Sequence, residues 1–505
     1  MGNKQSGSLH TNMIADKERK LEDAYHISKE LGTGSSTQIK QATLKKYTKT
    51  ERTRGVAIKL YDGKAEIPPD LKKEAHILGQ LDHPNIVRLF EVLKVGNDRS
   101  LVLELCSGGP LLDRLPFKED QASAIMRQLM SAVSYMHSKR IVHRDIDCSN
   151  ILFRTPDENS EIKLIDFGSA TELELVPNHP GAFKFLKDKT GSLHIMAPEV
   201  IRKRYGPGAD VWSCGIVAYT ILNEGKNPFL ANSVEETESK ILQGSIDYRG
   251  WKFSSKSKEF IQQTAMVNAG LRLTAAAALG HPWIEKTVAS WKLPNELVMS
   301  FGLFRVSPPL KRIALNCLAK KAPPSKYQKL FIELDTTKSG TLTKSEFLEG
   351  FKHSGNSPEE LDDLFEKLDV NMNGEIMFTE FLAATLEAEG ELEEAQLQEA
   401  FDMIAKKSKF ITKKHVLKLV GDEQKSLVKV AGDANSGKVK AMVDEIFEQK
   451  EKYSYEDFAR MFEHGFDSNR NMDAIIETSL NSEQLSALRE DDLARHLATI
   501  RENED

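Results

Sequence analysis

The chain has 505 residues, of which 40% are hydrophobic and 29% are charged. This composition is typical of globular proteins and excludes a chain that is disordered throughout. Four cysteines are too few for a disulfide framework and indicate a reducing compartment. No apolar run approaches the ~18 residues that a membrane-spanning helix needs. The net charge of −6 conceals an excess of Lys and Arg in residues 1–322 and of Asp and Glu after them. The two parts either attract each other or simply differ in composition.

The pattern of apolar residues divides the chain into domains. Residues 1–24 are polar and lack an apolar period, which predicts a flexible arm. Residues 25–284 begin with β-rich segments and continue with helical patterns. This order predicts an α+β domain with a small sheet lobe and a larger helical lobe. Strands are expected at 26–31, 55–60, 87–95 and 100–105, and helices at 69–81, 120–138 and 209–223.

The rest of the chain is expected to be helical. Residues 285–325 form a connector with two proline pairs, and its segment 310–321 is basic and apolar at helical spacing. Residues 326–465 alternate helical patterns with short polar loops, which predicts an all-α region. Residues 466–505 predict a helical tail. The chain is therefore expected to be multidomain, with an α+β domain followed by an all-α region.

A glycine-rich segment and a lysine lie among the first predicted strands. Gly32 and Gly34 let backbone amides approach a phosphate closely, although such a pattern alone is more often just a turn. Lys59 ends the segment Val56-Ala57-Ile58-Lys59. A buried lysine needs an anionic partner, which phosphate oxygens can provide. Glu74, in the next helical segment, is a candidate to hold Lys59 in place.

Three polar groups further along the chain suit phosphoryl transfer. Asp145 ends the triplet His143-Arg144-Asp145, and Asn150 follows it closely. Asp166 opens the triplet Asp166-Phe167-Gly168. One carboxylate that accepts a hydroxyl proton, with an Asp and an Asn that chelate Mg²⁺, is what this reaction requires.

The order of these motifs resembles the signature set of the protein kinases over residues 25–284, with Ala197-Pro198-Glu199 and the segment 210–215 closing the series. The resemblance implies a two-lobed kinase fold with ATP in the cleft. It makes Lys59 the partner of the α- and β-phosphates, with Glu74 holding that lysine.

The resemblance assigns roles to further residues. Asp145 becomes the catalytic base, and Asn150 and Asp166 become the ligands of Mg²⁺. Two structural contacts are also implied, which are Glu199 with Arg272 and Asp210 with the catalytic loop. The ATP-binding residues that it implies, including a hinge that bonds adenine, are Leu31, Gly32, Thr33, Gly34, Ser35, Ser36, Thr37, Ile39, Ala57, Lys59, Leu103, Glu104 and Cys106.

Four positions depart from the kinase pattern. Thr37 replaces the third glycine of the phosphate loop, which should stiffen that loop. Asp147 replaces a lysine, and a carboxylate near the transferred phosphoryl group should slow the reaction. Alternatively, Asp147 turns outward to a basic substrate residue or draws in a cation. Pro110 and Ser149 replace carboxylates that bind a substrate arginine in basophilic relatives, which should relax that preference. Candidate phosphorylation sites in the activation segment are Thr171, Thr190 and Ser192.

Two twelve-residue segments fit the EF-hand calcium loop, which needs oxygens at alternating positions, a central glycine and a closing glutamate. They run from 335 to 346 and from 369 to 380. Their expected calcium ligands are Asp335, Thr337, Ser339, Thr341 and Glu346 in the first loop, and Asp369, Asn371, Asn373, Glu375 and Glu380 in the second. Two further units, near 405–415 and 447–457, lack these ligands and are expected to fold without metal.

A kinase domain, a basic amphipathic connector and paired EF-hands together resemble the calcium-dependent protein kinases. The resemblance implies that the connector inhibits the kinase until Ca²⁺ makes the EF-hand region capture it. Alternatively, its apolar residues only pack the domains together. These residues are Phe301, Leu303, Phe304, Leu310, Ile313, Leu315 and Leu318.

The leading interpretation is a calcium-regulated serine/threonine kinase that uses ATP, Mg²⁺ and Ca²⁺, and whose activity Asp147 is expected to lower. The alternative is a calcium-responsive pseudokinase that binds nucleotide and acts as a switch or scaffold. The first residues fit the myristoylation pattern with Gly2 as acceptor. A cytoplasmic protein with reversible membrane association is therefore expected, with protein substrates and no nucleic-acid partner.

Overall fold

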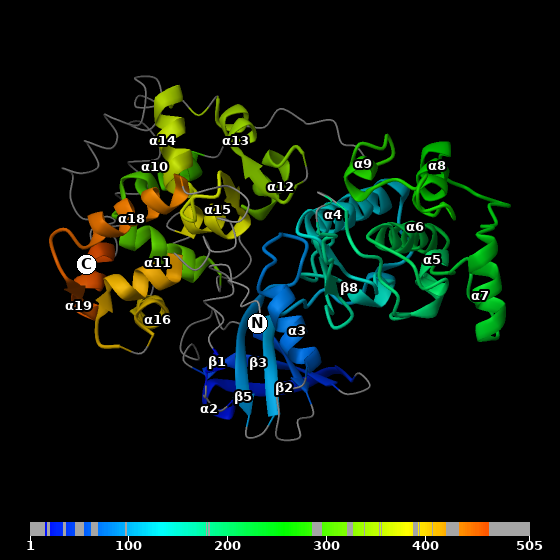
Figure 1. Ribbon diagram of the computed structural model, residues 1–505, viewed down its shortest axis with the longest axis horizontal. Helices are drawn as coiled ribbons and strands as arrows, with labels where there is room; N and C mark the ends of the chain where they lie inside the picture. The colour runs from blue at the N-terminus through cyan, green and yellow to red at the C-terminus, as the bar shows by residue number, and fades with distance from the viewer. Residues whose placement is uncertain are drawn as a thin grey trace, which may run out of the picture. The chain divides into compact units, whose positions relative to one another are not determined.

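The chain folds into two compact units, an N-terminal unit formed mainly by residues 10–288 and a C-terminal unit formed mainly by residues 289–336 and 341–505. Each can be followed by its colours in Figure 1. The computed structural model describes residues 16–17, 21–33, 37–45, 55–61, 69–95, 98–177, 179, 182–284, 295–320, 327–337, 339–352, 354, 356–386, 392, 394–406, 408–420 and 434–463. Gly2, Gly34, Ser35, Ser36 and the expected tail 466–505 lie outside these residues. No helix in the described part of the chain is long and apolar enough to cross a membrane.

A six-stranded sheet forms the first lobe of the N-terminal unit, in the order β1-β5-β6-β4-β3-β2. All neighbouring strands are antiparallel except β1, which runs parallel to β5. The strands are β1 (Asp16–Lys17), β2 (Tyr25–Thr33), β3 (Thr37–Leu44), β4 (Gly55–Tyr61), β5 (Leu89–Val95) and β6 (Asp98–Glu104). Helix α3 (Pro69–Leu78) interrupts them, as the sequence predicted. Its contacts with β5 and β6 bring Glu74 to the sheet.

The expected flexible arm is wrong for its last residues. Asp16–Lys17 pairs with Val92 and Leu93 at the edge of the sheet, and α2 (Leu21–Ala24) follows it. Leu21 and Ala24 are buried in the apolar cluster of this lobe. A segment this short carries no readable period, so only its packing against the sheet reveals it.

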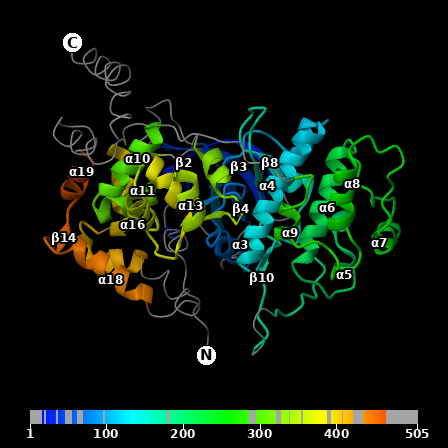
Figure 2. The ribbon, with the colours of Figure 1, turned by 90° about the horizontal axis from the view of Figure 1, so that it is seen from above.

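Helices dominate the second lobe of the N-terminal unit. They are α4 (Glu119–Ser138), α5 (Pro198–Ile201), α6 (Gly208–Leu222), α7 (Val234–Gln243), α8 (Ser255–Thr264) and α9 (Ala275–Leu279). Helix α6 is apolar on every side and packs between α4 and α8, as Figure 2 shows. A helix of this kind is stable only in a core. Two short antiparallel sheets flank the segments that contain Asp145 and Asp166. One pairs β7 (Ile141–Val142) with β10 (Thr171–Glu172), and the other pairs β8 (Ile151–Phe153) with β9 (Ile162–Leu164).

The C-terminal unit contains two pairs of helix–strand–helix motifs. The first pair comprises α12 (Gln328–Leu334), β11 (Thr341–Thr343), α13 (Lys344–Phe351), α14 (Pro358–Leu368), β12 (Glu375–Met377) and α15 (Phe378–Thr385). The second comprises α16 (Glu394–Ala405), β13 (Ile411–Thr412), a helix over 413–420, α18 (Ala434–Ile446), β14 (Lys452–Tyr453) and α19 (Tyr455–Glu463). In each pair the two strands form an antiparallel ladder.

The connector supplies two helices that pack inside this unit, α10 (Asn295–Val306) and α11 (Pro309–Ala319). Helix α10 contacts α14 and α15, whereas α11 contacts α15 of the first pair and α16, α18 and α19 of the second. The Phe301 ring lies 5.2 Å from that of Phe351 and 5.5 Å from that of Phe381. Of the seven apolar candidates, six are buried and Leu303 is half-buried. The connector is therefore part of the core of the C-terminal unit.

Candidate functional site

A buried lysine joins three elements of the N-terminal unit. The Nζ of Lys59, on β4, lies 3.0 Å from both carboxylate oxygens of Glu74 on α3 and 2.8 Å from Oδ1 of Asp166. Burial alone would lower the pKa of Lys59, but the two carboxylates outweigh it and raise that pKa. The motif residues that the sequence singled out therefore meet as one charged cluster, with the lysine ionised.

The strand register places other predicted nucleotide contacts on one face of the sheet. Ile39 lies opposite Lys59, and Ala57 lies opposite Leu103. Lys59 and Ala57 are two residues apart on β4, so all four side chains point to the same face. Of the remaining residues, Leu31 and Gly32 lie in β2, Thr33 ends it, Thr37 begins β3, Glu104 ends β6 and Cys106 follows it.

The catalytic loop holds its aspartate with hydrogen bonds on both oxygens. The backbone N–H of Ser192 donates to Oδ1 of Asp145 at 2.8 Å, and Nδ2 of Asn150 donates to Oδ2 at 3.1 Å. Nδ2 of Asn150 also donates to the Asp145 carbonyl at 2.9 Å. These bonds orient the carboxylate relative to the segment that contains Ser192.

Asp166 adopts a left-handed backbone conformation, with φ of +57°. This conformation is uncommon for a non-glycine residue, and such residues are enriched at functional sites. The next residue, Phe167, is buried with its ring edge against His143. Partial burial opposes ionisation of Asp166, but the Lys59 ammonium and the Gly168 N–H lower its pKa. The turn therefore presents an ionised carboxylate beside Lys59.

Two carboxylates, Asp210 and Glu199, hold the catalytic loop and the activation segment in place, as the resemblance to kinases implied. Asp210, on α6, accepts hydrogen bonds from the backbone N–H groups of His143 and Arg144 at 2.9 and 2.8 Å. Arg272 donates through two nitrogens to the carboxylate of Glu199. Asp210 therefore fixes the start of the catalytic loop, and Glu199 fixes the end of the activation segment.

The second EF-hand loop gathers its polar groups through backbone hydrogen bonds to its carboxylates. Backbone N–H groups of Asn373 and Gly374 donate to Asp369 at 2.9 and 2.8 Å. Glu380 accepts from the backbone N–H of Asn371 at 3.0 Å. The side-chain Oδ1 of Asn371 is buried and has no hydrogen-bond partner within the described residues. An orphaned buried oxygen of this kind fits a cation ligand.

The first loop has the same backbone plan. Gly340 and Gly374 have φ of +81° and +87°, as the sharp turn of the loop demands. Leu342 of β11 lies opposite Ile376 of β12, which joins the two loops. Glu346 accepts a hydrogen bond from the Thr336 hydroxyl at 3.0 Å. Asp335 and Thr341 are buried, Ser339 is half-buried and Thr337 is exposed.

Comparison with known proteins agrees with this geometry. The protein kinase domain model matches residues 25–284, and the EF-hand domain pair model matches residues 324–386. Calcium-dependent protein kinase 3 of Plasmodium yoelii yoelii is 33% identical over 73% of this chain and 69% of its own length. Calcium-dependent protein kinases 9 and 33 of Arabidopsis thaliana are 31% and 30% identical, over 87% and 90% of this chain and 82% and 88% of theirs. This chain belongs to the calcium-dependent protein kinase family.

In this calcium-dependent protein kinase, Asp147 does not point at the phosphoryl site as the sequence suggested. Its Oδ2 lies 2.8 Å from Nε2 of His194, and its Oδ1 accepts from the backbone N–H and hydroxyl of Ser149 at 2.8 and 2.7 Å. Burial opposes ionisation, but these hydrogen bonds lower the pKa of Asp147 to about 2. Its charge is therefore compensated inside the protein. No local motif in the sequence points to His194, because this residue lies in a different loop.

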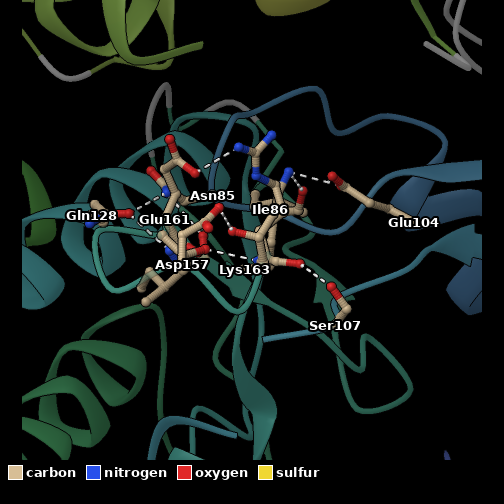
Figure 3. A network of polar contacts seen from close by, with 12 residues as sticks. Asn85, Ile86, Glu104, Ser107, Gln128, Asp157, Glu161 and Lys163 are labelled. Atoms are coloured by element: carbon tan, nitrogen blue, oxygen red, sulfur yellow. Dashed lines mark hydrogen bonds and ion pairs between the residues drawn. The ribbon is translucent and has the colours of Figure 1, made fainter. Parts of the chain in front are cut away.

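Glu104 opens the hinge, residues 104–106, that is predicted to bond adenine, but its side chain points into the protein interior. The Glu104 carboxylate is buried 2.8 Å from Nζ of Lys163, with Arg88 nearby. Figure 3 shows Glu104 and Lys163 in this network together with Asn85 and Gln128. Burial would raise the pKa of Glu104, but Lys163 and Arg88 lower it. Sequence reasoning missed Lys163, although a lysine between two apolar residues of a strand signals a buried ion pair.

The second EF-hand pair can be compared with the first position by position. Ile411 lies opposite Tyr453 as Leu342 lies opposite Ile376, so the loops can be aligned by their ladders. The closing position then falls at His415 in one loop and Asp457 in the other. Lys450 lies 2.5 Å from that Asp457. The Lys450 ammonium thus lies where Ca²⁺ would bind the closing carboxylate.

Proposed function

We propose that the N-terminal unit transfers the γ-phosphate of ATP to a serine or threonine hydroxyl of a protein substrate. The observation that carries this proposal is Lys59, held at 3.0 Å from Glu74 and 2.8 Å from Asp166. A kinase is competent when this lysine–glutamate pair and the metal-binding aspartate are in place together. Asp145 accepts the proton of the attacking hydroxyl, and Asn150 fixes its orientation.

Asp166 and Asn150 offer the oxygens that Mg²⁺ prefers. Lys59 engages Oδ1 of Asp166, which leaves Oδ2 for a cation. Nδ2 of Asn150 donates to Asp145, so its Oδ1 is the ligating atom. When bound, Mg²⁺ neutralises charge on the transferred phosphate. Because the Glu104 side chain faces its buried partner Lys163, the hinge reads adenine through its backbone.

The loops 335–346 and 369–380 supply the calcium sites. The buried, unpartnered Oδ1 of Asn371 and the ordered carboxylates of Asp369 and Glu380 support this assignment. When bound, Ca²⁺ compensates charge and dipoles that the loop has already brought together. Each loop contributes only two carboxylate ligands, since position 7, which is Thr341 or Glu375, offers its backbone carbonyl. The affinity should therefore lie at the weak end of the sensor range.

The connector couples calcium binding by the C-terminal unit to phosphate transfer by the N-terminal unit. Helices α10 and α11 are buried in the C-terminal unit, where Phe301 packs between Phe351 and Phe381. Capture of an amphipathic helix by EF-hands is a known recognition mode. We assign this arrangement to the state in which the connector is withheld from the kinase. Calcium drives capture, and loss of calcium releases the connector to inhibit.

The decisive experiment measures phosphate transfer from ATP to a peptide library by the full chain, with and without Ca²⁺. Calcium-dependent transfer is expected. Asp166→Asn should abolish it while the chain still folds. Calcium-independent transfer would refute the switch. Absence of transfer with ATP bound would favour a pseudokinase, which no observation in the described residues supports.

A further inference from the structure

A cavity of about 460 Å³ opens beside the catalytic loop within the N-terminal unit. One wall is formed by Asp147 of the catalytic loop and His194 of the activation segment. Thr220, near the end of α6, and Lys226, just after that helix, also line the cavity. Leu112 and Leu230 also line the cavity, and they are 37% and 62% exposed. Exposed leucines that line a mainly apolar cavity are typical of a surface that a partner covers.

The position of this cavity relative to Asp145 follows from two parallel contacts. The Ser192 N–H donates to Asp145 at 2.8 Å. Two residues further along both segments, His194 lies 2.8 Å from Asp147. An extended chain advances about 3.3 Å per residue, so the cavity begins roughly two residues from the catalytic aspartate. A peptide whose hydroxyl reaches Asp145 would place a residue about two positions away at this cavity.

The charges of the cavity favour an anion. Asp147 is 13% exposed and already accepts bonds from His194 and Ser149, so it is not available to a basic side chain. The hydrogen bond to Asp147 raises the pKa of His194, which keeps the imidazole cationic to higher pH. Lys226 is exposed, and none of the described residues forms an ion pair with it. Among the residues that line the cavity, the Lys226 ammonium therefore remains unpaired, whereas the charges of His194 and Asp147 offset each other.

We propose that this cavity is a substrate subsite for an acidic side chain, aspartate or glutamate, about two residues from the phosphoacceptor. The proposal rests on the proposed kinase function and names its substrate class. The Lys226 ammonium pairs with the substrate carboxylate, and Leu112 and Leu230 contact its methylene groups. This goes beyond the relaxed arginine preference expected from Pro110 and Ser149, since the preference is reversed in sign.

The test uses the full chain with Ca²⁺, Mg²⁺ and ATP, and peptides with Glu, Gln or Lys at each of three positions on either side of one serine. Glu should exceed Gln in kcat/KM by roughly three- to tenfold at one position near the second residue, as one partly desolvated charge pair provides. Lys226→Gln should remove this ratio, and Lys226→Glu should reverse it in favour of Lys. The matched control is Lys256→Gln on α8, an exposed lysine outside the cavity, which should keep the ratio.

Peptide binding by fluorescence anisotropy, with a non-hydrolysable ATP analogue, provides a readout that does not need catalysis. Tighter binding of the Glu peptide, lost in Lys226→Gln, supports the subsite. Equal binding and equal turnover of Glu and Gln peptides overturn it, as does a Glu preference that survives Lys226→Glu. Absence of transfer to every peptide refutes the proposed kinase function instead, while the binding ratio still decides the subsite.

Discussion

The guanidinium of Arg144 forms an ion pair with the carboxylate of Asp188 in the activation segment. Nε of Arg144 also donates to the Ser169 carbonyl at 2.6 Å, and the Tyr205 hydroxyl donates to the Asp188 carbonyl at 2.9 Å. In many kinases a phosphorylated residue supplies the anion that orders this segment through an arginine. Here a built-in carboxylate occupies that role. The segment therefore has an anchoring carboxylate of its own, Asp188, two residues before the candidate site Thr190.

Asp188→Asn should lower kcat about three- to tenfold, because it removes one partly exposed charge pair from the segment that holds Ser192. Steady-state kinetics with a peptide substrate measures this. Glu174→Gln is the matched control, since Glu174 forms an exposed ion pair with Lys184 in the same segment, and its kcat should be unchanged. Wild-type protein treated with phosphatase should keep its activity. A large loss on that treatment would contradict the role of Asp188.

Lys163→Met should destabilise the N-terminal unit by about 3 kcal/mol, because it leaves the buried Glu104 carboxylate without its nearest cation. The double variant Lys163→Met with Glu104→Leu should regain most of this stability, since both charges are then absent. Urea denaturation followed by tryptophan fluorescence measures both. If the single variant is as stable as the wild type, Lys163 does not compensate Glu104.

Calcium should bind at two sites, with dissociation constants on the order of 10⁻⁶ to 10⁻⁵ M. Glu346→Gln should leave one site, and adding Glu380→Gln should leave none, because each removes the closing bidentate carboxylate of its loop. Isothermal titration calorimetry gives the stoichiometry directly. Four sites, or binding that survives both changes, would show that the second EF-hand pair also binds calcium.

Calcium affinity of the second loop should fall in acid. Burial raises the pKa of Asp369 to about 6, although the N–H groups of Gly374 and Asn373 oppose it. Below that pH the ion-free carboxyl carries a proton that calcium must displace, so affinity should drop about tenfold per pH unit. Calorimetry on Glu346→Gln isolates this loop. Equal affinities at about pH 5 and pH 7 would refute the shift.

Phe301→Ala should destabilise the C-terminal unit by about 3–5 kcal/mol, because it removes a ring packed between Phe351 and Phe381. If capture of the connector is the switch, calcium activation should weaken in parallel. Val306→Ala is the control on the same helix, since Val306 is 56% exposed. Thermal unfolding and kinase activity with calcium measure the two effects. Activation that is unaffected by Phe301→Ala would separate connector packing from regulation.

Much of the fold follows from patterns that are local in the sequence. The amphipathic period predicted α4 within one residue, as Asp120 was the expected start and Glu119 is the observed one. The strand β1 was missed because two residues carry no period, and its pairing with Val92 decides its structure. The calcium loops were predicted because their ligands lie within twelve consecutive residues, where spacing alone fixes the geometry.

The sequence by itself determined which groups we propose for the chemistry, since Lys59, Asp145 and Asp166 stand in recognisable local motifs. Only the tertiary structure decided what Asp147 does, because its partner His194 lies 47 residues away in another loop. The same holds for the hinge, where Lys163 draws the Glu104 side chain into the interior. A charged side chain between possible partners goes to the one that packing brings within hydrogen-bond distance, because desolvation makes any unpaired alternative costly.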